Sequence, residues 1–420
     1  MSTTNDTLNV LSFNCWGLVV VAKHREFRLR AIATALQHQN CDIITLQEVW
    51  VQKDFEYIQE AVKQTLPYTK YFYSGALGSG LAILSRFPII STSYHRYALN
   101  GKPLKFWHGD YYVGKGVGSA LVDHPAIGLL EVFNTHLHAG YGPKAQYTAH
   151  RATECWQLAN ILRQSAAMGR QIVMSGDFNS VPSSFNYRLI RDHGFMSDSW
   201  LQLHGEPDAT QFDMDNITED AYTQYFGFTC NSPYNTFSRY YDHGDSTNAK
   251  KLLGKRLDYI FYRHSPQLTC IESKVVLTGL VPDSSMSYSD HFGVVSVFST
   301  TPSPHAQQQE KEMAPIPSLL CHPNYTHLQP SIVQEILDEL RQDRDKAKEH
   351  AHTLLYAFAL CVLLQIVFYI LIVVLPTTLS YHGTLPIILV TVFDGALMNL
   401  TSLLIPLFHQ RNRDTSTQSG

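Results

Sequence analysis

Polar side chains that can bind a cation or move a proton recur at the ends of short apolar stretches in this sequence. Carboxylate and amide oxygens, with no sulfur ligand among them, suit a hard cation such as Mg²⁺ better than Zn²⁺. Two imidazoles would allow one proton to be taken from water and another to be delivered to a leaving group. Each residue alone is typical of a turn or of an ordinary surface group, but the whole set indicates metal-assisted hydrolysis. The set is Asn14, Glu48, His136, Asp177, Asn179, Asp258, Asp290 and His291.

The stretches that carry these residues are predicted to be strands of an α/β fold, in which binding sites form at strand ends. Two helices are expected between them, at Lys23–Gln39 and Lys144–Leu162, because apolar residues recur there with helical spacing. In the second helix we expect one face to carry Ala145, Ala149, Ala152, Trp156 and Ala159. The strands are expected at Leu8–Asn14, Asp42–Leu46, Tyr68–Ser74, Gly80–Ser85, Gly116–Val122, Leu129–Thr135, Gln171–Ser175 and Arg256–Tyr262, with a last one from Val294.

The composition predicts a folded protein with a substantial core and no nucleic-acid partner. The 420 residues are 45% hydrophobic and carry a formal net charge of -4, without a block of Lys or Arg that would grip a phosphate backbone. The seven cysteines are scattered and form no C-x-x-C pair, which favours reduced thiols in the cytosol. The polar stretch from Met1 to Asn9 lacks the apolar segment of a secretory signal.

The C-terminal part of the chain differs in composition and predicts a membrane anchor. Residues 299–330 are rich in Pro, Ser and Gln and are expected to be a linker, and residues 331–350 an amphipathic, charged helix. Residues 353–408 then contain two apolar stretches, Leu354–Val374 and Leu385–Phe408, each long enough to cross a bilayer. A core helix is the alternative for each stretch alone, but two in succession favour a transmembrane hairpin.

The charges around the two apolar stretches predict the orientation of this hairpin. Lys and Arg residues precede the first stretch and follow the second, whereas the connection between them has none. Both ends should therefore face the cytosol, together with the large N-terminal domain. The endoplasmic reticulum or another endomembrane is the expected location, with the plasma membrane as an alternative.

Six short motifs resemble those of the DNase I-like endonuclease/exonuclease/phosphatase superfamily. They are Asn-Cys-Trp-Gly, Gln-Glu-Val-Trp, Thr-His-Leu-His, Gly-Asp-Phe-Asn, Arg-Leu-Asp-Tyr and Ser-Asp-His, in this order between Leu8 and Phe298. Within the superfamily, Phe13–Gly17, Gly78–Leu81 and the expected hairpin are similar to the neutral sphingomyelinases. The resemblance implies a catalytic domain over residues 8–298, built as a four-layer sandwich of two packed β-sheets flanked by helices.

The resemblance also implies roles for the polar residues around a bound Mg²⁺. Glu48 would be the principal metal ligand, with Asn14 beside it and Asp290 on the metal side of the phosphate. His291 would be the general base, and Asp258 would orient its imidazole.

On the phosphate side, the resemblance implies that Asp177 and Asn179 position water and stabilise the phosphoryl oxygens. His136 would donate to the phosphate or to the leaving oxygen. We leave out His138, because we expect it to point to the opposite face of the strand from His136.

The aromatic stretch from Lys105 to Gly116 contains a second pair of interest. Its aromatic side chains could be ordinary core or could lie at a membrane interface. The spacing of Asp110 and Lys115 resembles an Asp/Lys pair that neutral sphingomyelinases hold beside the active site. We expect Lys115 to contact the substrate phosphate, with Asp110 holding it in reserve.

The function implied by the resemblance is Mg²⁺-dependent hydrolysis of sphingomyelin to ceramide and phosphocholine, with lysophospholipids as further candidate substrates. A phosphoinositide 5-phosphatase is an alternative, but its Trp-x-Gly-Asp and Cys-Asp-Arg patterns are replaced here by Met174–Asp177 and Arg256–Asp258. A DNA nuclease would share the catalytic core without needing a bilayer anchor. A non-enzymatic membrane adaptor on the same scaffold is the remaining alternative.

Overall fold

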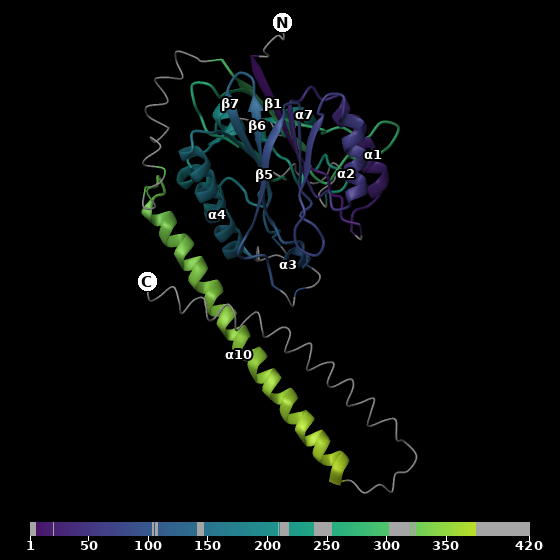
Figure 1. Ribbon diagram of the computed structural model, residues 1–420, viewed down its shortest axis with the longest axis vertical. Helices are drawn as coiled ribbons and strands as arrows, with labels where there is room; N and C mark the ends of the chain where they lie inside the picture. The colour runs from purple at the N-terminus through teal and green to yellow at the C-terminus, as the bar shows by residue number, and fades with distance from the viewer. Residues whose placement is uncertain are drawn as a thin grey trace. The chain divides into compact units, whose positions relative to one another are not determined.

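The structure is a computed structural model of the whole chain, and the chain divides into two compact units after Val333 (Figure 1). The residues described are 6–301 without 20, 103–104, 106–107, 141–146, 209, 211–217 and 239–253, followed by 320, 322 and 325–374. The first unit comprises Met1–Val333 and the second Gln334–Gly420.

Two six-stranded sheets form the first unit. Strands β1 and β2 of the first sheet are parallel, as are β7 and β8 of the second, and the other described pairs are antiparallel. The first sheet has the order β11 (Thr269–Val276), β12 (Gly293–Ser299), β1 (Thr7–Asn14), β2 (Ile43–Gln47), β4 (Ala82–Ser85), β3 (Tyr68–Tyr71). The second has the order β5 (Ile89–Arg96), β6 (Gly116–His124), β7 (Gly128–His136), β8 (Gln171–Asp177), β10 (Asp258–Tyr262), β9 (Ser197–Asp198).

Helices cover the outer faces of both sheets and complete four layers (Figure 1). Helices α1 (Arg25–Gln37) and α2 (Gln52–Val62) pack their apolar stripes on the first sheet, and α4 (Thr148–Ala167) packs beside β8 on the second. The layered α/β architecture expected from the sequence is therefore confirmed. Short helices lie in the connections: α3 (Asp110–Val113), α5 (Phe185–Arg188), η2 (Leu189–His193), α6 (Ser199–His204) and α7 (Glu219–Phe226).

The two-residue period of the strands decides what lies between the sheets. In β1, Leu8 and Val10 enter the core between the sheets, whereas Leu11 and Phe13 enter the core beneath α1 and α2. The same register places Asn14 on the inner face. It also places the last residues of β7 and β8 and the first residue of β10 on the inner face. Residues an even number of positions away on the same strands, such as Val132, Val173 and Ile260, belong to the inner core. The inner layer is thus apolar along most of its length and polar at one end.

The secondary structure differs from the expectation in several parts, and helix α2 and strand β11 are among the elements that were not expected. Trp156 is exposed on α4 and stacks on His193, with ring centroids 4.2 Å apart. Ala149, Ala152 and Ala159 of the expected face are buried together with Cys155 and Leu158, so Trp156 is the exception among the described residues of that face. Strand β5 was not expected, because it is a largely exposed edge strand and its sequence is mostly polar.

The C-terminal part of the stretch expected to be a linker belongs to the first unit and packs against Arg163 and Phe195. Arg163 on α4 is buried and donates hydrogen bonds to the backbone oxygens of Leu320 (3.0 Å), His322 (2.7 Å) and Tyr325 (2.7 Å). Tyr325 also stacks on Phe195, with ring centroids 5.4 Å apart. Residues 302–319 of the expected linker lie outside the described part of the chain.

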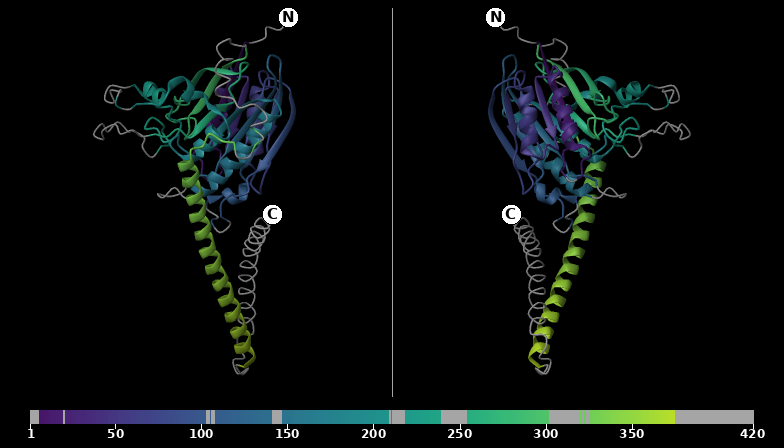
Figure 2. Two further views of the ribbon diagram at one scale, coloured as in Figure 1. Left: turned by 90° about the vertical axis from the view of Figure 1, so that its left-hand side faces the viewer. Right: turned by 90° about the vertical axis from the view of Figure 1, so that its right-hand side faces the viewer.

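A long helix, α10 (Pro330–Val374), follows as one continuous element (Figures 1 and 2). The charged helix and the first apolar stretch expected from the sequence are therefore parts of a single helix. By length and composition, Pro330–Val367 is a candidate to span a membrane. The second apolar stretch, Leu385–Phe408, lies outside the described residues, as does the connection that would complete the expected hairpin.

Candidate active site

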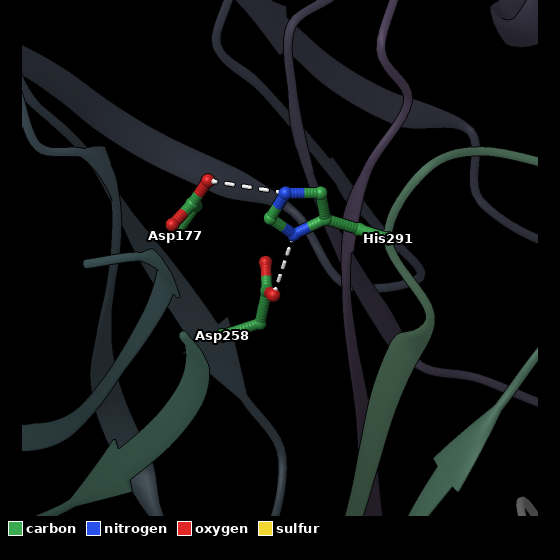
Figure 3. Close-up of side chains that lie close together, drawn as sticks. All are labelled: Asp177, Asp258 and His291. Carbon is green, nitrogen blue, oxygen red and sulfur yellow. Dashed lines mark hydrogen bonds and ion pairs between the residues drawn. The ribbon is translucent and has the colours of Figure 1, made fainter. Parts of the chain in front are cut away.

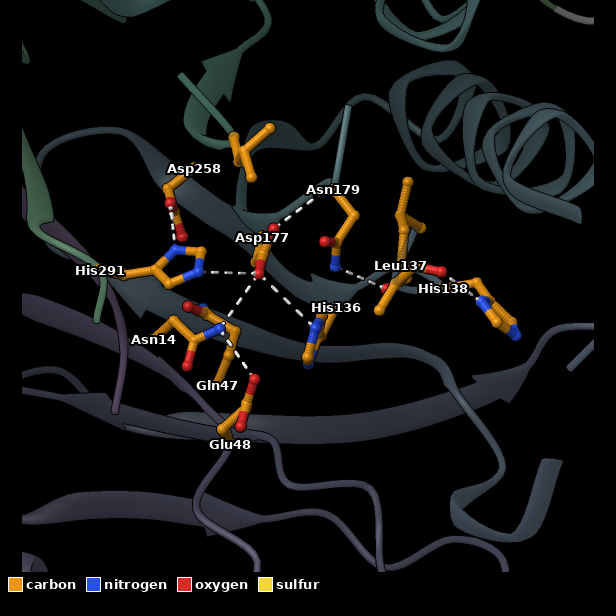
Figure 4. Close-up of polar contacts among 12 residues, drawn as sticks. Asn14, Gln47, Glu48, His136, Leu137, His138, Asp177, Asn179, Asp258 and His291 are labelled. Carbon is orange, nitrogen blue, oxygen red and sulfur yellow. Dashed lines mark hydrogen bonds and ion pairs between the residues drawn. The ribbon is translucent and has the colours of Figure 1, made fainter. Parts of the chain in front are cut away.

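Asp177, the last residue of β8, lies at the centre of the polar end of the inner layer (Figure 4). Its Oδ2 accepts a hydrogen bond from Asn14 Nδ2 (3.0 Å) and lies 3.5 Å from His136 Nε2 and 3.9 Å from His291 Nε2. Its Oδ1 accepts from the backbone N–H of Asn179 at 2.8 Å. Burial and the nearby Asp258 carboxylate raise the pKa of Asp177 to about 7. The buried carboxylate thus joins residues of both sheets.

The preceding glycine is needed for this arrangement. Gly176 has φ +144°, and a Cβ there would lie 1.9 Å from the backbone oxygen of Thr135 on the neighbouring strand β7. No other residue type fits without moving the strand that carries His136.

His291 and Asp258 form a buried hydrogen-bonded pair beside Asp177 (Figure 3). His291 Nδ1 lies 2.8 Å from Asp258 Oδ2, which leaves Nε2 facing Asp177. Burial disfavours the charged ring, but the carboxylate of Asp258, with smaller contributions from Cys230 and Asp177, raises the pKa of His291 well above its ordinary value. This is the geometry of an imidazole held in one orientation by a carboxylate and made more basic by it.

Glu48 lies across the site from this pair, immediately after β2. Its φ of +57° is unusual for a residue with a long side chain and is the kind of backbone strain that collects at functional sites. Asn14 Nδ2 donates to Glu48 Oε1 at 3.2 Å, and Trp50 Nε1 lies 3.5 Å from Oε2. Burial and the charge of Asp290 raise the pKa of Glu48, and burial also raises the pKa of Asp290. Two carboxylates in this situation would be stabilised by a cation.

The residues present fit a hard cation, and two subsets of them offer ligands. Among the described residues, oxygen and nitrogen atoms of Asp177, Asp258 and His291 lie within 4.8 Å of one another and could hold a metal ion. The ligands expected from the sequence were instead Glu48, Asn14 and Asp290. Because Asp258 and His291 already satisfy each other at 2.8 Å, an ion between them would have to replace that hydrogen bond. Within the described part of the protein, no hydrogen bond joins Glu48 and Asp290, so an ion between these two acids would not have to replace one.

His136, at the end of β7, contributes a neutral imidazole. Burial, and then the charge of Lys115, holds its pKa well below the ordinary value. Its Nδ1 is buried and has no hydrogen-bond partner within the described part of the protein, so it remains available to a bound molecule.

Asn179 lies beside His136 in a left-handed backbone conformation with φ +46°. Its Nδ2 donates to the backbone oxygen of Leu137 at 3.1 Å. The hydrogen bond from its backbone N–H to Asp177 and this side-chain hydrogen bond together fix the Asn179 amide just after the C-terminal end of β8.

The structure brings Lys115 and Asp110 together as a buried ion pair, with Lys115 Nζ 2.9 Å from Asp110 Oδ1. The same Nζ donates to the Leu137 backbone oxygen at 2.7 Å, so Lys115 and Asn179 share one acceptor. The charge of Lys115 also lowers the pKa values of Glu48 and Asp177 against the effect of burial. Lys115 therefore adds positive charge to the centre of the site while its ammonium group is held by Asp110.

His138 points away from Asp177, as expected, but for a different reason (Figure 4). Residues two apart along a strand share a face, so the alternation that was invoked would have placed His138 beside His136. Strand β7 ends at His136, however, and His138 stacks on Tyr147 and lies 3.8 Å from Asp110.

The sequence reasoning missed a layer of polar residues beneath the site. Thr45 and Ser175 hydroxyls meet across the sheets at 2.7 Å, and Gln47 Nε2 donates to Asn134 Oδ1 at 2.7 Å. Strand alternation could have revealed it, because Gln47 and Asn134 lie on the inner face of their strands. Thr229 was also missed, although its hydroxyl accepts the backbone N–H of Asp258 at 3.2 Å. No periodic pattern marks the stretch around Thr229, so only the structure reveals that contact.

Comparison with known proteins places this site in a family. Residues 11–291 match the Endonuclease/Exonuclease/phosphatase family. An inositol phosphosphingolipids phospholipase C of Schizosaccharomyces pombe is 40% identical over 309 residues, which are 72% of this chain and 71% of that protein. Sphingomyelin phosphodiesterase 2 is 32% identical in Rattus norvegicus (71% of this chain, 66% of that protein) and 30% identical in Homo sapiens (73% and 68%).

The chain therefore belongs to the endonuclease/exonuclease/phosphatase family. Within that family it is related to phosphodiesterases named for sphingolipid substrates, so the resemblance identified from the motifs and the assignment to phosphoric diester hydrolases are confirmed. The chain spans about two thirds of the length of these relatives.

Proposed function

We propose that this chain is a Mg²⁺-dependent, membrane-anchored phosphodiesterase that hydrolyses sphingomyelin to ceramide and phosphocholine. The observation that carries the proposal is the buried imidazole of His291, held by Asp258 at 2.8 Å and directed at the Asp177 carboxylate to which Asn14 also bonds. Two related proteins are named for this substrate or its inositol-bearing counterpart, which supports the choice of a sphingolipid.

Glu48, Asn14 and Asp290 would hold the Mg²⁺ ion through oxygen atoms, and the ion would supply positive charge against the phosphoryl oxygens. The burial of Glu48 and Asp290 and the Asp290 charge beside Glu48 support this assignment, because they raise the pKa of Glu48, and burial raises that of Asp290, against the opposing nearby cations. The group of Asp177, Asp258 and His291 is the competing location.

His291 would accept a proton from water at Nε2 as the water oxygen forms its bond to phosphorus. The phosphorus–oxygen bond to ceramide breaks on the opposite side, and the ceramide oxygen gains a proton. Asp258 would keep the ring in position and stabilise its charged form. Hydrogen bonds to Asp177 from Asn14 and from the backbone of Asn179 keep that carboxylate at the centre of these groups.

The phosphate oxygens would be contacted by Asn179, His136 and Lys115. Lys115 is the one that must first leave a partner, since Asp110 holds it at 2.9 Å. We propose that substrate phosphate competes with Asp110 for the ammonium group, so that the ion pair keeps the charge ready without leaving it unpaired in a buried place.

Residues 8–298 would form the catalytic domain, residues 299–330 a connection, 331–350 a charged helical segment and 353–408 a two-helix anchor. The candidate span Pro330–Val367 supports an anchor. The flanking Lys and Arg residues support a catalytic domain on the cytosolic side, at the endoplasmic reticulum or another endomembrane.

An inositol phosphosphingolipid is a second candidate substrate, favoured by the 40% identity to the enzyme of Schizosaccharomyces pombe. Detergent-solubilised full-length protein should be incubated with sphingomyelin, an inositol phosphosphingolipid, a lysophospholipid, a phosphoinositide and abasic DNA, each with Mg²⁺ and with EDTA. Mg²⁺-dependent release of the phosphorylated headgroup from either sphingolipid supports the proposal. Turnover of only the phosphoinositide or DNA would replace it, and no turnover would favour the adaptor.

A further inference from the structure

Exposed apolar side chains form the tip of the connection between β1 and α1. Leu18, Val19 and Val21 are 37%, 58% and 61% exposed. The tip is a compact turn, in which the backbone N–H groups of Val21 and Ala22 both donate to Leu18 O, at 3.3 Å and 2.9 Å. A turn of this kind that presents aliphatic side chains to water is costly unless something covers it.

This apolar tip stands directly beside the site. Gly17, next to it, donates its backbone N–H to Glu48 O at 2.9 Å, and a Cβ on Gly17 would lie 2.4 Å from that oxygen. The buried Arg28 fixes both ends of the connection by donating to Trp16 O (2.7 Å) and Lys23 O (2.8 Å). The apolar tip is therefore held in its exposed position by a rigid base.

A second exposed apolar pair lies on the other side of the Glu48 turn. Tyr73 and Leu77, in the connection between β3 and β4, are 64% and 55% exposed. Gly80, at the end of that connection, accepts the backbone N–H of Val49 at 3.0 Å. Because β1 and β2 are parallel and β4 is antiparallel to β2, both connections leave the same end of the sheet.

We propose that the apolar tip (Leu18, Val19 and Val21), together with Tyr73 and Leu77, inserts into the surface of a lipid bilayer and brings the site to the level of the lipid headgroups. The inference rests on the proposed function, since a lipid phosphodiester reaches the site only from a bilayer surface. Aliphatic and aromatic side chains with the exposed Lys23 beside them fit a phosphate-bearing interface. The chain also carries the candidate span in α10, so a bilayer is the partner that its own sequence supplies.

Fluorescence can test the insertion without any turnover. Val19→Trp in the full chain, reconstituted into phosphatidylcholine vesicles, should be quenched by lipids brominated in the acyl chains, beyond the quenching of the native tryptophans. Leu129→Trp is the matched control, because Leu129 is 46% exposed and lies seven residues before the site end of β7, about 23 Å away. Equal, weak quenching of both variants would overturn the proposal.

Activity gives a second test that separates the inference from the proposed function. Val19→Asp and Leu77→Asp should each lower hydrolysis of vesicle-embedded sphingolipid by about tenfold, the scale of losing one buried aliphatic side chain. Both should leave hydrolysis of a short-chain, monodisperse analogue unchanged, and Leu129→Asp should change neither rate. If vesicle hydrolysis is unaffected while the wild-type protein turns over, the membrane surface is wrong and the enzyme assignment stands. If the wild type hydrolyses neither substrate, the proposed function fails and the fluorescence comparison decides the surface by itself.

Discussion

Asn14 and Asp177 are joined by a hydrogen bond of 3.0 Å, although 163 residues separate them and they belong to different sheets. The same amide nitrogen lies 3.2 Å from Glu48. Asn14 therefore connects the side of the site that would carry the general base with the side that would carry the cation.

Asn14→Ala should remove a donor from a buried carboxylate and misplace Glu48. We expect kcat to fall by about 100-fold and the free energy of unfolding by about 1–3 kcal/mol. Steady-state kinetics and denaturant unfolding measure the two effects. Asn160→Ala on α4, whose amide donates to Trp156 O and lies 3.4 Å from His193 Nε2, should leave kcat unchanged. A fully active Asn14→Ala variant would remove Asn14 from the site.

Glu48→Ala and His291→Ala should each lower kcat by about a thousandfold or more while the fold persists. The first would remove a ligand of the proposed cation, and the second would remove the proposed base. Glu56→Ala, an exposed acid on α2, is the control. Circular dichroism and turnover under Mg²⁺ saturation make the comparison, and near-normal turnover in either site variant would contradict the assigned role.

Removal of the metal should distinguish the two candidate cation locations. EDTA should abolish turnover, and Mg²⁺ should restore it. Glu48→Gln should raise the Mg²⁺ concentration needed for half-maximal activity by about tenfold or more, because one anionic ligand is lost. If Asp258→Asn raises that concentration and Glu48→Gln does not, the ion lies in the group of Asp177, Asp258 and His291.

Lys115→Gln should depress activity through loss of a phosphate contact. Charge reversal is a poor test, because it would bury a second carboxylate against Asp110. We expect kcat/KM to fall by about 100-fold with the melting temperature lowered only modestly. Lys63→Gln, an exposed lysine next to α2 that pairs with Glu60, serves as the control. Wild-type kinetics in Lys115→Gln would return the ion pair to a structural role.

The stability of the fold should decrease as pH rises through neutrality. Burial raises the pKa of Glu154 from 4.5 to about 8, against the opposing hydrogen bond from the backbone of His138. The folded state therefore holds this proton more tightly than the unfolded state, and the stabilisation present below pH 4.5 is lost as pH rises to about 8. Glu154 alone cannot change the free energy of unfolding by more than about 1.4 kcal/mol per pH unit. Melting temperatures across this range should vary less in Glu154→Gln, and an unchanged pH profile would exclude Glu154 as the cause.

The sequence was sufficient to predict which polar residues come together in the candidate site, because strand periodicity acts on each segment separately. Asn14, His136, Asp177 and Asp258 each extend an alternating apolar run, so their inner-face positions follow from the run itself. The motif resemblance then supplied the family and the layered fold.

Contacts between distant segments could not be predicted in the same way. The support of Asp258 by Thr229 comes from a stretch without periodicity. The left-handed backbone of Glu48 accepts a hydrogen bond from Gly17, and the raised pKa of Glu154 arises from burial, so both depend on segments that are far apart in the chain. Trp156 is exposed although Ala149, Ala152 and Ala159 on the same helical face are buried, because helical spacing alone does not show where the covered part of a face ends.

The guanidinium of Arg163 bears on how a soluble fragment should be designed. A fragment truncated at Phe298 would retain every motif residue but would lose the three carbonyl oxygens of Leu320, His322 and Tyr325 that accept from this side chain. It would also uncover Phe195, on which Tyr325 stacks. The smallest autonomous version of this enzyme should therefore be cut after Gln329, immediately before the long helix begins.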